Sequence, residues 1–284
     1  MPAFKHILFP VDFSERCRAI RPFVNSMALK YSAKLTLMHI VQLPTNMYGI
    51  HPDYPAVFRL TERSEDARRE LDAFLDPRAP GISMETIVDR GDPPICITTF
   101  AEANDVDLIM MPTHGYGRFR GLLLGSVTAK VLHDAKCAVW TSTHTEDPNL
   151  IAHLHCKSIL CALDLSAGSR AIMDYAAELA HESKAKLRLV HAVHEAKSQP
   201  EKDFSNFLRQ VAREELVKLQ HHARTNFEVC LEGGGVSDVI RAAALHHEAD
   251  LVVIGRGSIH EVFGRLRTNA YNIIRDSPCP VLSV

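Results

Sequence analysis

The chain repeats itself, and this repetition limits the fold more than any other feature of the sequence. Three segments of the first half recur in the second half, at offsets of 152, 143 and 142 residues: 5–12 as 157–164, 106–111 as 249–254, and 136–139 as 278–281. The falling offset makes the first copy about ten residues longer, and a proline-containing stretch at 43–57 is expected to hold the excess as a loop. The repeat predicts two domains, 1–146 and 153–284, with the boundary between them in a polar linker at 142–156.

Each copy contains five short β-rich runs separated by segments of helical periodicity. The runs are continuously apolar, as expected for parallel strands that are covered on both faces. They are expected near residues 5–11, 34–41, 83–89, 106–112 and 137–142, and near 157–164, 185–193, 227–232, 249–255 and 279–284.

Apolar residues at helical spacing lie between the first two runs of each copy, around Ile20–Tyr31 and Ile172–Ala180. Pro22 fits the first helix only near its start, and Pro93-Pro94 begins a later helix. Alternating strands and helices predict an α/β fold of two repeated doubly wound domains. We expect each domain to be a five-stranded parallel sheet of order 3-2-1-4-5 flanked by helices.

Composition excludes several classes of protein. The 284 residues carry 32 Lys+Arg against 34 Asp+Glu, and a net charge of −2 argues against a dedicated binder of nucleic acid or membrane surfaces. No apolar run approaches the roughly 18 residues of a membrane span. Seven cysteines without a CxxC motif indicate reduced thiols, and the expected location is cytoplasmic.

The residues that point to a ligand follow the first and fourth strands, where the winding of such a sheet reverses and ligands bind. The first strand leads into Asp12. The fourth leads into a glycine-rich segment, after which Ser126 opens a helix whose N-terminus favours a phosphate. Arg118, Arg120 and Lys130 add positive charge there, with no acid between Gly115 and Lys130. The alternative is that Asp12 caps the first helix and the glycines only shape a surface loop.

These motifs resemble the universal stress protein family over both copies almost end to end. Family members that bind ATP carry G-x2-G-x9-G-[S/T] after the fourth strand. The first copy has Gly115, nine residues, then Gly125-Ser126, whereas Pro112 replaces the first glycine and removes an amide. The resemblance implies a stress-response regulator whose first domain binds ATP.

The resemblance also implies roles for individual residues. Val11 and Asp12 contact the nucleoside, with Asp12 on the ribose, and Ile40 and Val41 meet the adenine edge. The phosphates are held together with Mg2+ or Mn2+ by Gly115, Gly125, Ser126 and Val127.

The second copy departs further from the family pattern. An offset of 142 places Gly257 opposite Gly115 and replaces Gly125-Ser126 by Arg267-Thr268. We expect this domain to have lost ordinary ATP binding and to serve a structural, dimerising or different-ligand role.

Two other functions remain open. The chain is alternatively a nucleotide-independent interaction scaffold, for instance a homodimer that contacts unknown regulatory proteins. A weak ATPase has less support, because only His114 and Asp12 are evident catalytic candidates.

Two further motifs are interpreted as structural. His153, His155, Cys156 and Cys161 match no usual zinc spacing, so no metal site is expected. The glycine run in 232–238 is interpreted as a tight turn into a helix.

Overall fold

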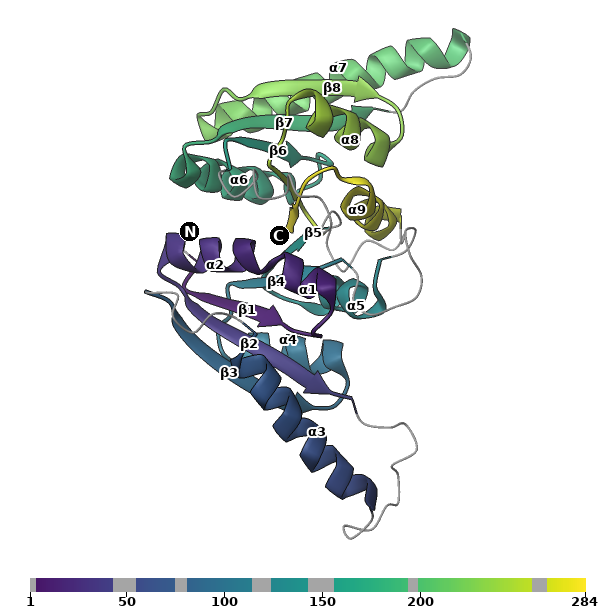
Figure 1. Cartoon of the computed structure of the whole chain (residues 1–284). Helices are drawn as coiled ribbons and strands as arrows, with labels where there is room; N and C mark the ends of the chain where they lie inside the picture. The colour runs from purple at the N-terminus through teal and green to yellow at the C-terminus, as the bar shows by residue number, and fades with distance from the viewer. Residues whose placement is uncertain are drawn as a thin grey trace. The chain divides into compact units, whose positions relative to one another are not determined.

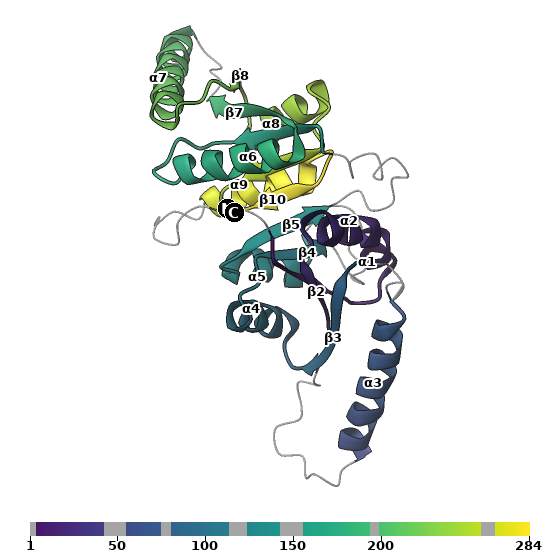
Figure 2. The same cartoon turned by 90° about the vertical axis from the view of Figure 1, so that its left-hand side faces the viewer.

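The structure is a computed structural model that describes residues 4–42, 55–74, 81–113, 124–142, 156–193, 199–256 and 265–284. The chain divides into two compact units, one ending at Trp140 and the other continuing from Thr141 to Val284. Each unit is a parallel sheet with helices on both faces (Figures 1 and 2).

The strands of the first domain have the order β3-β2-β1-β4-β5. The second domain repeats this arrangement as β8-β7-β6-β9-β10. The expected order 3-2-1-4-5 and the doubly wound α/β class are therefore confirmed in both copies. The strands are β1 His6–Pro10, β2 Lys34–Val41, β3 Ser83–Arg90, β4 Leu108–Pro112, β5 Ala138–Ser142, β6 Ser158–Ala162, β7 Lys186–Val193, β8 Glu228–Gly233, β9 Leu251–Ile254 and β10 Val281–Ser283.

The helices begin and end where the sequence provides physical signals. Proline lies in the first turn of α2 and α4, where its missing N–H costs no hydrogen bond. The buried residues of α6 include Met173, Ala176 and Ala180, which share one face. The helices are α1 Glu15–Ala19, α2 Arg21–Tyr31, α3 Pro55–Asp72, α4 Pro93–Ala103, α5 Ser126–Asp134, α6 Ser169–Ser183, α7 Gln199–Ala223, α8 Val236–His246 and α9 Arg265–Asp276.

One boundary predicted from sequence is wrong. The loop expected at 43–57 ends earlier, because Pro55–Val57 already belong to α3. A proline at the first position of a helix is favoured, since its fixed φ suits the helix and its missing amide has no partner to lose. Residues 43–54 lie outside the described part of the chain.

The starts of the two sheets are held by the same contact. The Asp107 carboxylate accepts hydrogen bonds from the amides of Lys5 and His6, at 2.7 and 2.9 Å. In the second copy the Asp250 carboxylate accepts from the amides of Lys157 and Ser158 at the same distances. These hydrogen bonds fix the amino ends of β1 and β6 in the same way. The two copies differ in the loops that follow the carboxyl ends of these strands.

Candidate functional site

The carboxyl ends of β1 and β4 lie side by side in the first domain. The two strands pair in parallel, with Ile7 opposite Leu108 and Leu8 opposite Ile109. The loops that follow them therefore leave the sheet at neighbouring points. This edge, between the first and fourth strands of a doubly wound sheet, is where ligands bind in such folds.

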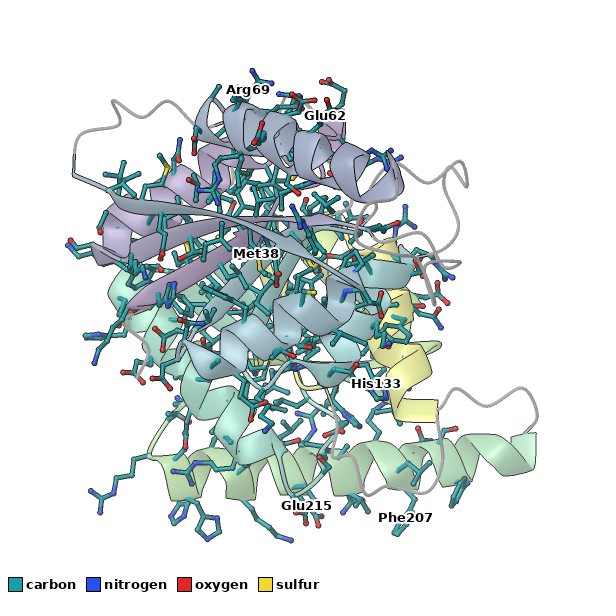
Figure 3. All side chains as sticks on the ribbon, turned by 90° about the horizontal axis from the view of Figure 1, so that it is seen from below. Met38, Glu62, Arg69, His133, Phe207 and Glu215 are labelled. Carbon is teal, nitrogen blue, oxygen red and sulfur yellow. The ribbon has the colours of Figure 1, made fainter. Side chains whose placement is uncertain are left out.

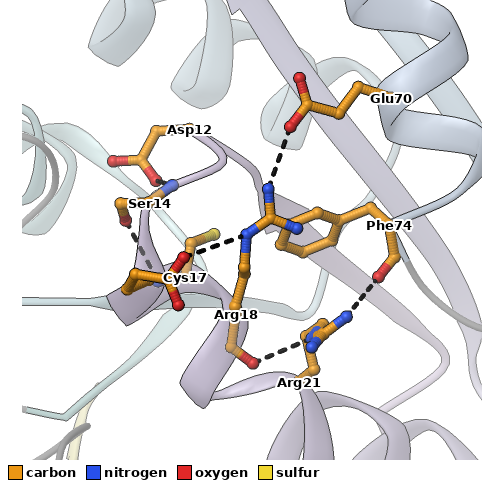
Figure 4. Close-up of polar contacts among 8 residues, drawn as sticks. Asp12, Ser14, Cys17, Arg18, Arg21, Glu70 and Phe74 are labelled. Atoms are coloured by element: carbon orange, nitrogen blue, oxygen red, sulfur yellow. Dashed lines mark hydrogen bonds and ion pairs between the residues drawn. The ribbon is translucent and has the colours of Figure 1, made fainter.

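The loop after β1 is a tight turn built around Asp12. Its Oδ1 accepts a hydrogen bond from the amide of Ser14 at 2.9 Å, and the Ser14 hydroxyl accepts from the amide of Cys17 at 3.2 Å (Figure 4). Ser14, rather than Asp12, is therefore the N-cap of α1. Phe13 between them has φ of 62°, in the left-handed region that a bulky residue rarely adopts.

Aromatic packing holds this turn in place. The Phe13 ring lies 4.5 Å from the His39 ring and 5.8 Å from the Phe74 ring, between centroids. The His39 Nδ1 also hydrogen-bonds the carbonyl oxygen of Val11 at 2.7 Å. His39 and Phe74 were not predicted from the sequence, because their roles depend on side chains of β2 and the end of α3 that meet only in the folded chain. One feature of the sequence could have indicated His39: the second copy has a histidine, His191, at the same 152-residue offset.

Two arginines also contact the Phe74 ring. The guanidinium groups of Arg18 and Arg21 lie 5.3 and 5.4 Å from the centre of the Phe74 ring. Arg18 also pairs with Glu70 at 3.0 Å, and Arg21 donates to the Phe74 carbonyl at 2.9 Å (Figure 4). These contacts join α1 and α2 to the end of α3 beneath the Asp12 turn.

Burial isolates Cys17 from chemistry at the site. Its side chain is fully buried, and burial together with the charge of Asp12 raises the pKa of its thiol far above the usual range. Cys17 is therefore a neutral packing residue below the turn.

The predicted nucleoside residues gather at this edge. Val11 is buried and its amide donates to the Met38 carbonyl at 2.8 Å. Ile40 and Val41 are the buried last residues of β2, and successive strand residues face opposite sides of the sheet. They can therefore border one ligand together only around the end of the strand.

The loop after β4 is closed at its base by two hydrogen bonds. The Gly125 amide donates to the Thr113 carbonyl at 2.8 Å, and the Thr128 hydroxyl donates to the Pro112 carbonyl at 3.1 Å. Gly125 is the N-cap of α5, so Ser126 and Val127 begin the helix directly beside the end of β4. The first turn of α5 contains no acid and has no side-chain cap, which suits an anion. Gly115, His114, Arg118 and Arg120 lie outside the described residues.

The positive charge expected at this loop is reduced by an acid distant in sequence. Lys130 Nζ lies 3.6 Å from the carboxylate of Asp92, the N-cap residue of α4. The sequence from Gly115 to Lys130 contains no acidic residue. The acid that pairs with Lys130 comes from the start of α4 instead.

The second copy repeats the first turn with an additional donor. The Asp164 Oδ1 accepts from the Ser166 amide and from the Ser169 hydroxyl, both at 2.9 Å. Partial desolvation opposes the charge of Asp164, but these hydrogen bonds outweigh it and hold the pKa of the carboxyl below its usual range. Asp164, the counterpart of Asp12 in the repeat, therefore accepts hydrogen bonds from two groups of the protein itself.

Strand register identifies the counterpart of Pro112 in the second copy. Ile159 pairs with Leu251 as Ile7 pairs with Leu108, so the 143-residue offset of these strands places Gly255 opposite Pro112. A Cβ on Gly255 would lie 2.2 Å from Cδ1 of Ile172 in α6. The glycine is required there by helix packing. Gly257 lies outside the described residues, as do the side chains of Arg267 and Thr268.

The glycine run 232–238 is a turn into α8. Gly234 has φ of 145°, and Asp238 lies so close to Gly235 that a Cβ there would be 2.7 Å from its Oδ2. An acid of the protein itself thus occupies the start of this helix.

Metal-ligating side chains do not cluster within the described residues, where no group of three or more His, Cys, Asp or Glu could hold an ion. His153 and His155 lie outside that part of the chain. None of the described helices is long and apolar enough to cross a membrane.

Comparison with known proteins gives one consistent result. The universal stress protein family matches residues 3–142 and again residues 155–284. A universal stress protein of Thermus aquaticus is 30% identical over 137 residues, which are 48% of this chain and 96% of that protein.

The fold is shared with a solved structure. A universal stress protein from Archaeoglobus fulgidus covers 99% of this chain and 97% of its own, with a TM-score of 0.69 and 22% identity. Another universal stress protein, solved in complex with cAMP, covers 45% of this chain and 96% of its own, with 25% identity and a TM-score of 0.35. Two matches that together span nearly the whole chain place it in a family: the chain belongs to the universal stress protein family and carries two such domains in tandem.

Proposed function

We propose that this protein is a stress-response regulator whose first domain binds ATP, with Mg2+ or Mn2+, at the edge formed by β1 and β4. The observation that carries the proposal is the hydrogen bond from Gly125 to Thr113, 2.8 Å long. It holds the N-terminus of α5 against the end of β4, and β4 is the neighbour of the strand that leads into Asp12.

Asp12 is suited to the ribose. It is half-buried, and its Oδ1 accepts the Ser14 amide, which orients the carboxylate within the turn. A carboxylate has about four acceptor positions, so one amide donor leaves it able to accept hydroxyl groups.

The N-terminus of α5 is suited to the phosphates. Helix amides and the helix dipole favour an anion, and neither an acid nor a side-chain cap competes for them. Gly125, Ser126, Val127 and Gly115 are the proposed phosphate residues. Phosphate oxygens on these groups would be the ligands for Mg2+.

Pro112 is compatible with this site. Gly255 at the matching position serves the packing of Ile172, so a glycine there has a structural reason that is independent of any ligand. Ile20 matches Ile172 at the 152-residue offset, and the helix of the first copy is interrupted at Ile20. In the first copy β4 contacts α1, whereas in the second copy β9 contacts α6, so the packing role of Gly255 does not carry over to position 112.

Calorimetric titration of the full chain with Mg-ATP tests the proposal. We expect binding by the wild type and loss of the heat in Gly125→Glu, because a carboxylate at the start of α5 opposes a phosphate. Gly168→Glu is the matched control: it places the same side chain at the N-cap of α6, where a Cβ meets only Ser166 Oγ at 3.8 Å. Wild type that shows no heat at millimolar ATP would refute the proposal.

An apolar stripe on α7 favours a second function, association with another copy of this chain. Phe204, Phe207 and Val211 are 57%, 59% and 37% exposed, and their spacing places them on one face of the helix. Figure 3 shows Phe207 on the outer side of α7, whereas Ala212 and Leu216 are buried on its inner side. Exposed apolar patches of this kind mark interaction sites.

Sedimentation velocity separates this function from the first. If the protein is such a scaffold, the wild type sediments as a homodimer in the absence of nucleotide, and the Phe207→Glu variant sediments as a monomer. A wild type that stays monomeric at all concentrations removes the scaffold function and leaves ATP binding untouched. In either case we propose a cytoplasmic protein that acts through regulatory partners.

A further inference from the structure

A cysteine and a histidine are in contact at the far edge of the second sheet, away from the nucleotide edge. Cys230 lies on β8, the outermost strand, and His247 is the C-cap residue of α8. The Cys230 Sγ and the His247 Nε2 are 3.2 Å apart, within hydrogen-bonding distance for sulfur. Both residues are partly exposed, so small molecules in solution can reach them.

Polar neighbours fix the histidine at this position. The Ser158 hydroxyl donates to the His247 carbonyl at 3.1 Å and accepts from Arg188 at 3.3 Å. Arg188 is itself held by Glu228 at 3.0 Å. These contacts join β6, β7 and β8 to the end of α8 and hold the main chain of His247 there.

The first domain has no such pair at the matching place. By strand register, Ile87 stands where Cys230 stands, and Asn104 is the C-cap residue of α4 as His247 is of α8. His6 there bonds Thr36 at 2.8 Å and the Asn104 carbonyl at 2.9 Å. The second copy thus replaces an aliphatic side chain and an amide by a thiol and an imidazole.

The protonation states suit proton transfer from sulfur to nitrogen. Burial, followed by the charge of Glu228, raises the pKa of the Cys230 thiol, so the resting thiol keeps its proton. Burial and the charge of Arg188 lower the pKa of His247, so its ring is neutral and can accept a proton. A neutral base in contact with a nucleophile is the arrangement that activates cysteine in many enzymes.

Within the described part of the chain, four of the other cysteines, Cys17, Cys96, Cys161 and Cys279, have no histidine contact of this kind. Cys17, Cys161 and Cys279 are buried, which keeps reagents away. Cys96 is partly exposed, but its contacts are the Arg90 carbonyl at 3.9 Å and the acids Asp89 and Asp92, which raise the pKa of its thiol after burial does. Cys96 is therefore an internal comparison within the same molecule.

We propose that Cys230 is a peroxide-reactive thiol with His247 as its general base. The Sγ attacks one oxygen of hydrogen peroxide as its proton moves to His247 Nε2. The O–O bond breaks, and the departing hydroxide takes the proton from the imidazolium and leaves as water. Sulfur is oxidised from thiol to sulfenic acid, peroxide is reduced to water, and the histidine returns to its neutral form. This site is independent of the proposed ATP site.

Peptide mass spectrometry of the full chain tests the proposal. The protein is treated with hydrogen peroxide, sulfenic acid is trapped with dimedone, and the rates at Cys230 and Cys96 are compared. We expect Cys230 to be the faster by about tenfold or more, the lower end of what a positioned base contributes. Equal rates at Cys230 and Cys96 would overturn the proposal.

Two variants separate catalysis from structure. His247→Asn, which copies the Asn104 cap of the first domain, should slow Cys230 by about tenfold or more and leave Cys96 unchanged. His246→Asn changes the adjacent ring, which lies 4.7 Å from that of His247, and should leave both rates unchanged. A His247→Asn protein that oxidises at the wild-type rate contradicts the role of His247.

The pH profile distinguishes a base from a packing residue. Other charged groups near the pair are Lys186 and Arg188 on β7, Glu228 and Glu232 on β8, and His246 on α8. We expect the wild-type rate to level off once His247 is neutral. In His247→Asn the rate should instead rise about tenfold per pH unit with the thiolate fraction. Identical profiles would overturn the proposal.

Discussion

The turns that follow β1 and β6 share a backbone but differ in what surrounds them. Phe13 and Leu165 have φ of 62° and 61°, and in each turn an aspartate accepts the amide two residues later at 2.9 Å. Asp12 lies beside Cys17, whereas Asp164 accepts a second hydrogen bond from Ser169. The same fold thus gives the Asp12 carboxylate one hydrogen-bond donor from the turn and the Asp164 carboxylate two.

The side chains at the two turns also differ in how deeply they are buried. Phe13 is buried against His39 and Phe74, whereas Leu165 is partly exposed and Asp164 is exposed. A strained residue persists where its surroundings determine its conformation. The first turn therefore has the greater support from its surroundings, as the proposed nucleotide site requires.

The largest expected effect comes from removing the aromatic support of the first turn. Phe74 is 1% exposed, so Phe74→Ala should lower the free energy of unfolding by about 3–5 kcal/mol. Fluorescence of Trp140, the chain's one tryptophan and buried in this domain, follows the loss during urea unfolding. Ile95→Ala, at an exposed site of α4 in the same domain, is the control and should change stability by less than about 0.5 kcal/mol. A loss below about 1 kcal/mol for Phe74→Ala would contradict the assigned support.

The next effect tests the packing of the second domain. Gly255→Ala places a Cβ 2.2 Å from Ile172 Cδ1 and should cost about 1–3 kcal/mol in urea unfolding followed by circular dichroism. Ile172→Val removes Cδ1, so the double variant should regain most of this loss. Single losses that simply add in the double variant would show that the two residues do not clash.

Exchanging one atom between the turns gives a smaller effect. Cys17→Ser supplies Asp12 with the hydroxyl donor that Ser169 gives Asp164, and should weaken ATP binding about threefold to tenfold, about 1 kcal/mol. The reverse change, Ser169→Cys, is the matched control and should leave ATP affinity unchanged. Equal affinities of wild type and Cys17→Ser would exclude Asp12 as a ligand of the nucleotide.

Ser169→Cys also has a pH signature. The folded pKa of Asp164 lies below its ordinary value of 3.8, so its hydrogen bonds add stability above that pH and lose it as pH falls through the folded pKa. Removing the Ser169 donor should raise the Asp164 pKa toward 3.8, as measured by NMR titration of the carboxyl carbon. An unchanged titration would show that the Ser169 hydroxyl contributes nothing.

The smallest effect concerns Pro112. Because the matching glycine is explained by Ile172, Pro112→Gly should change the Kd for ATP by less than about threefold, or about 0.7 kcal/mol. A tenfold gain in affinity would instead show that the missing amide of Pro112 costs the site a phosphate contact.

Much of the fold could be predicted from sequence, because buried parallel strands leave continuous apolar runs and the repeat supplied each pattern twice. Every strand end lies within two residues of its expected position. The loop expected to include 55–57 was wrong because Pro55 is favourable both in loops and at a helix start.

The surroundings of the site could be predicted less well. Sequence reasoning located Asp12 and Ser126 from local motifs, but Asp92, His39 and Phe74 act through contacts between distant elements. The 143-residue offset between β4 and β9 was predicted from sequence and agrees with the strand register, whereas the loops that follow these strands lie largely outside the described residues.

The stoichiometry of Mg-ATP binding tests the difference between the two domains most directly. The account predicts one site per full-length chain by calorimetry, abolished by Gly125→Glu and retained in Gly168→Glu. Two sites per chain, or one site that survives Gly125→Glu, would contradict it.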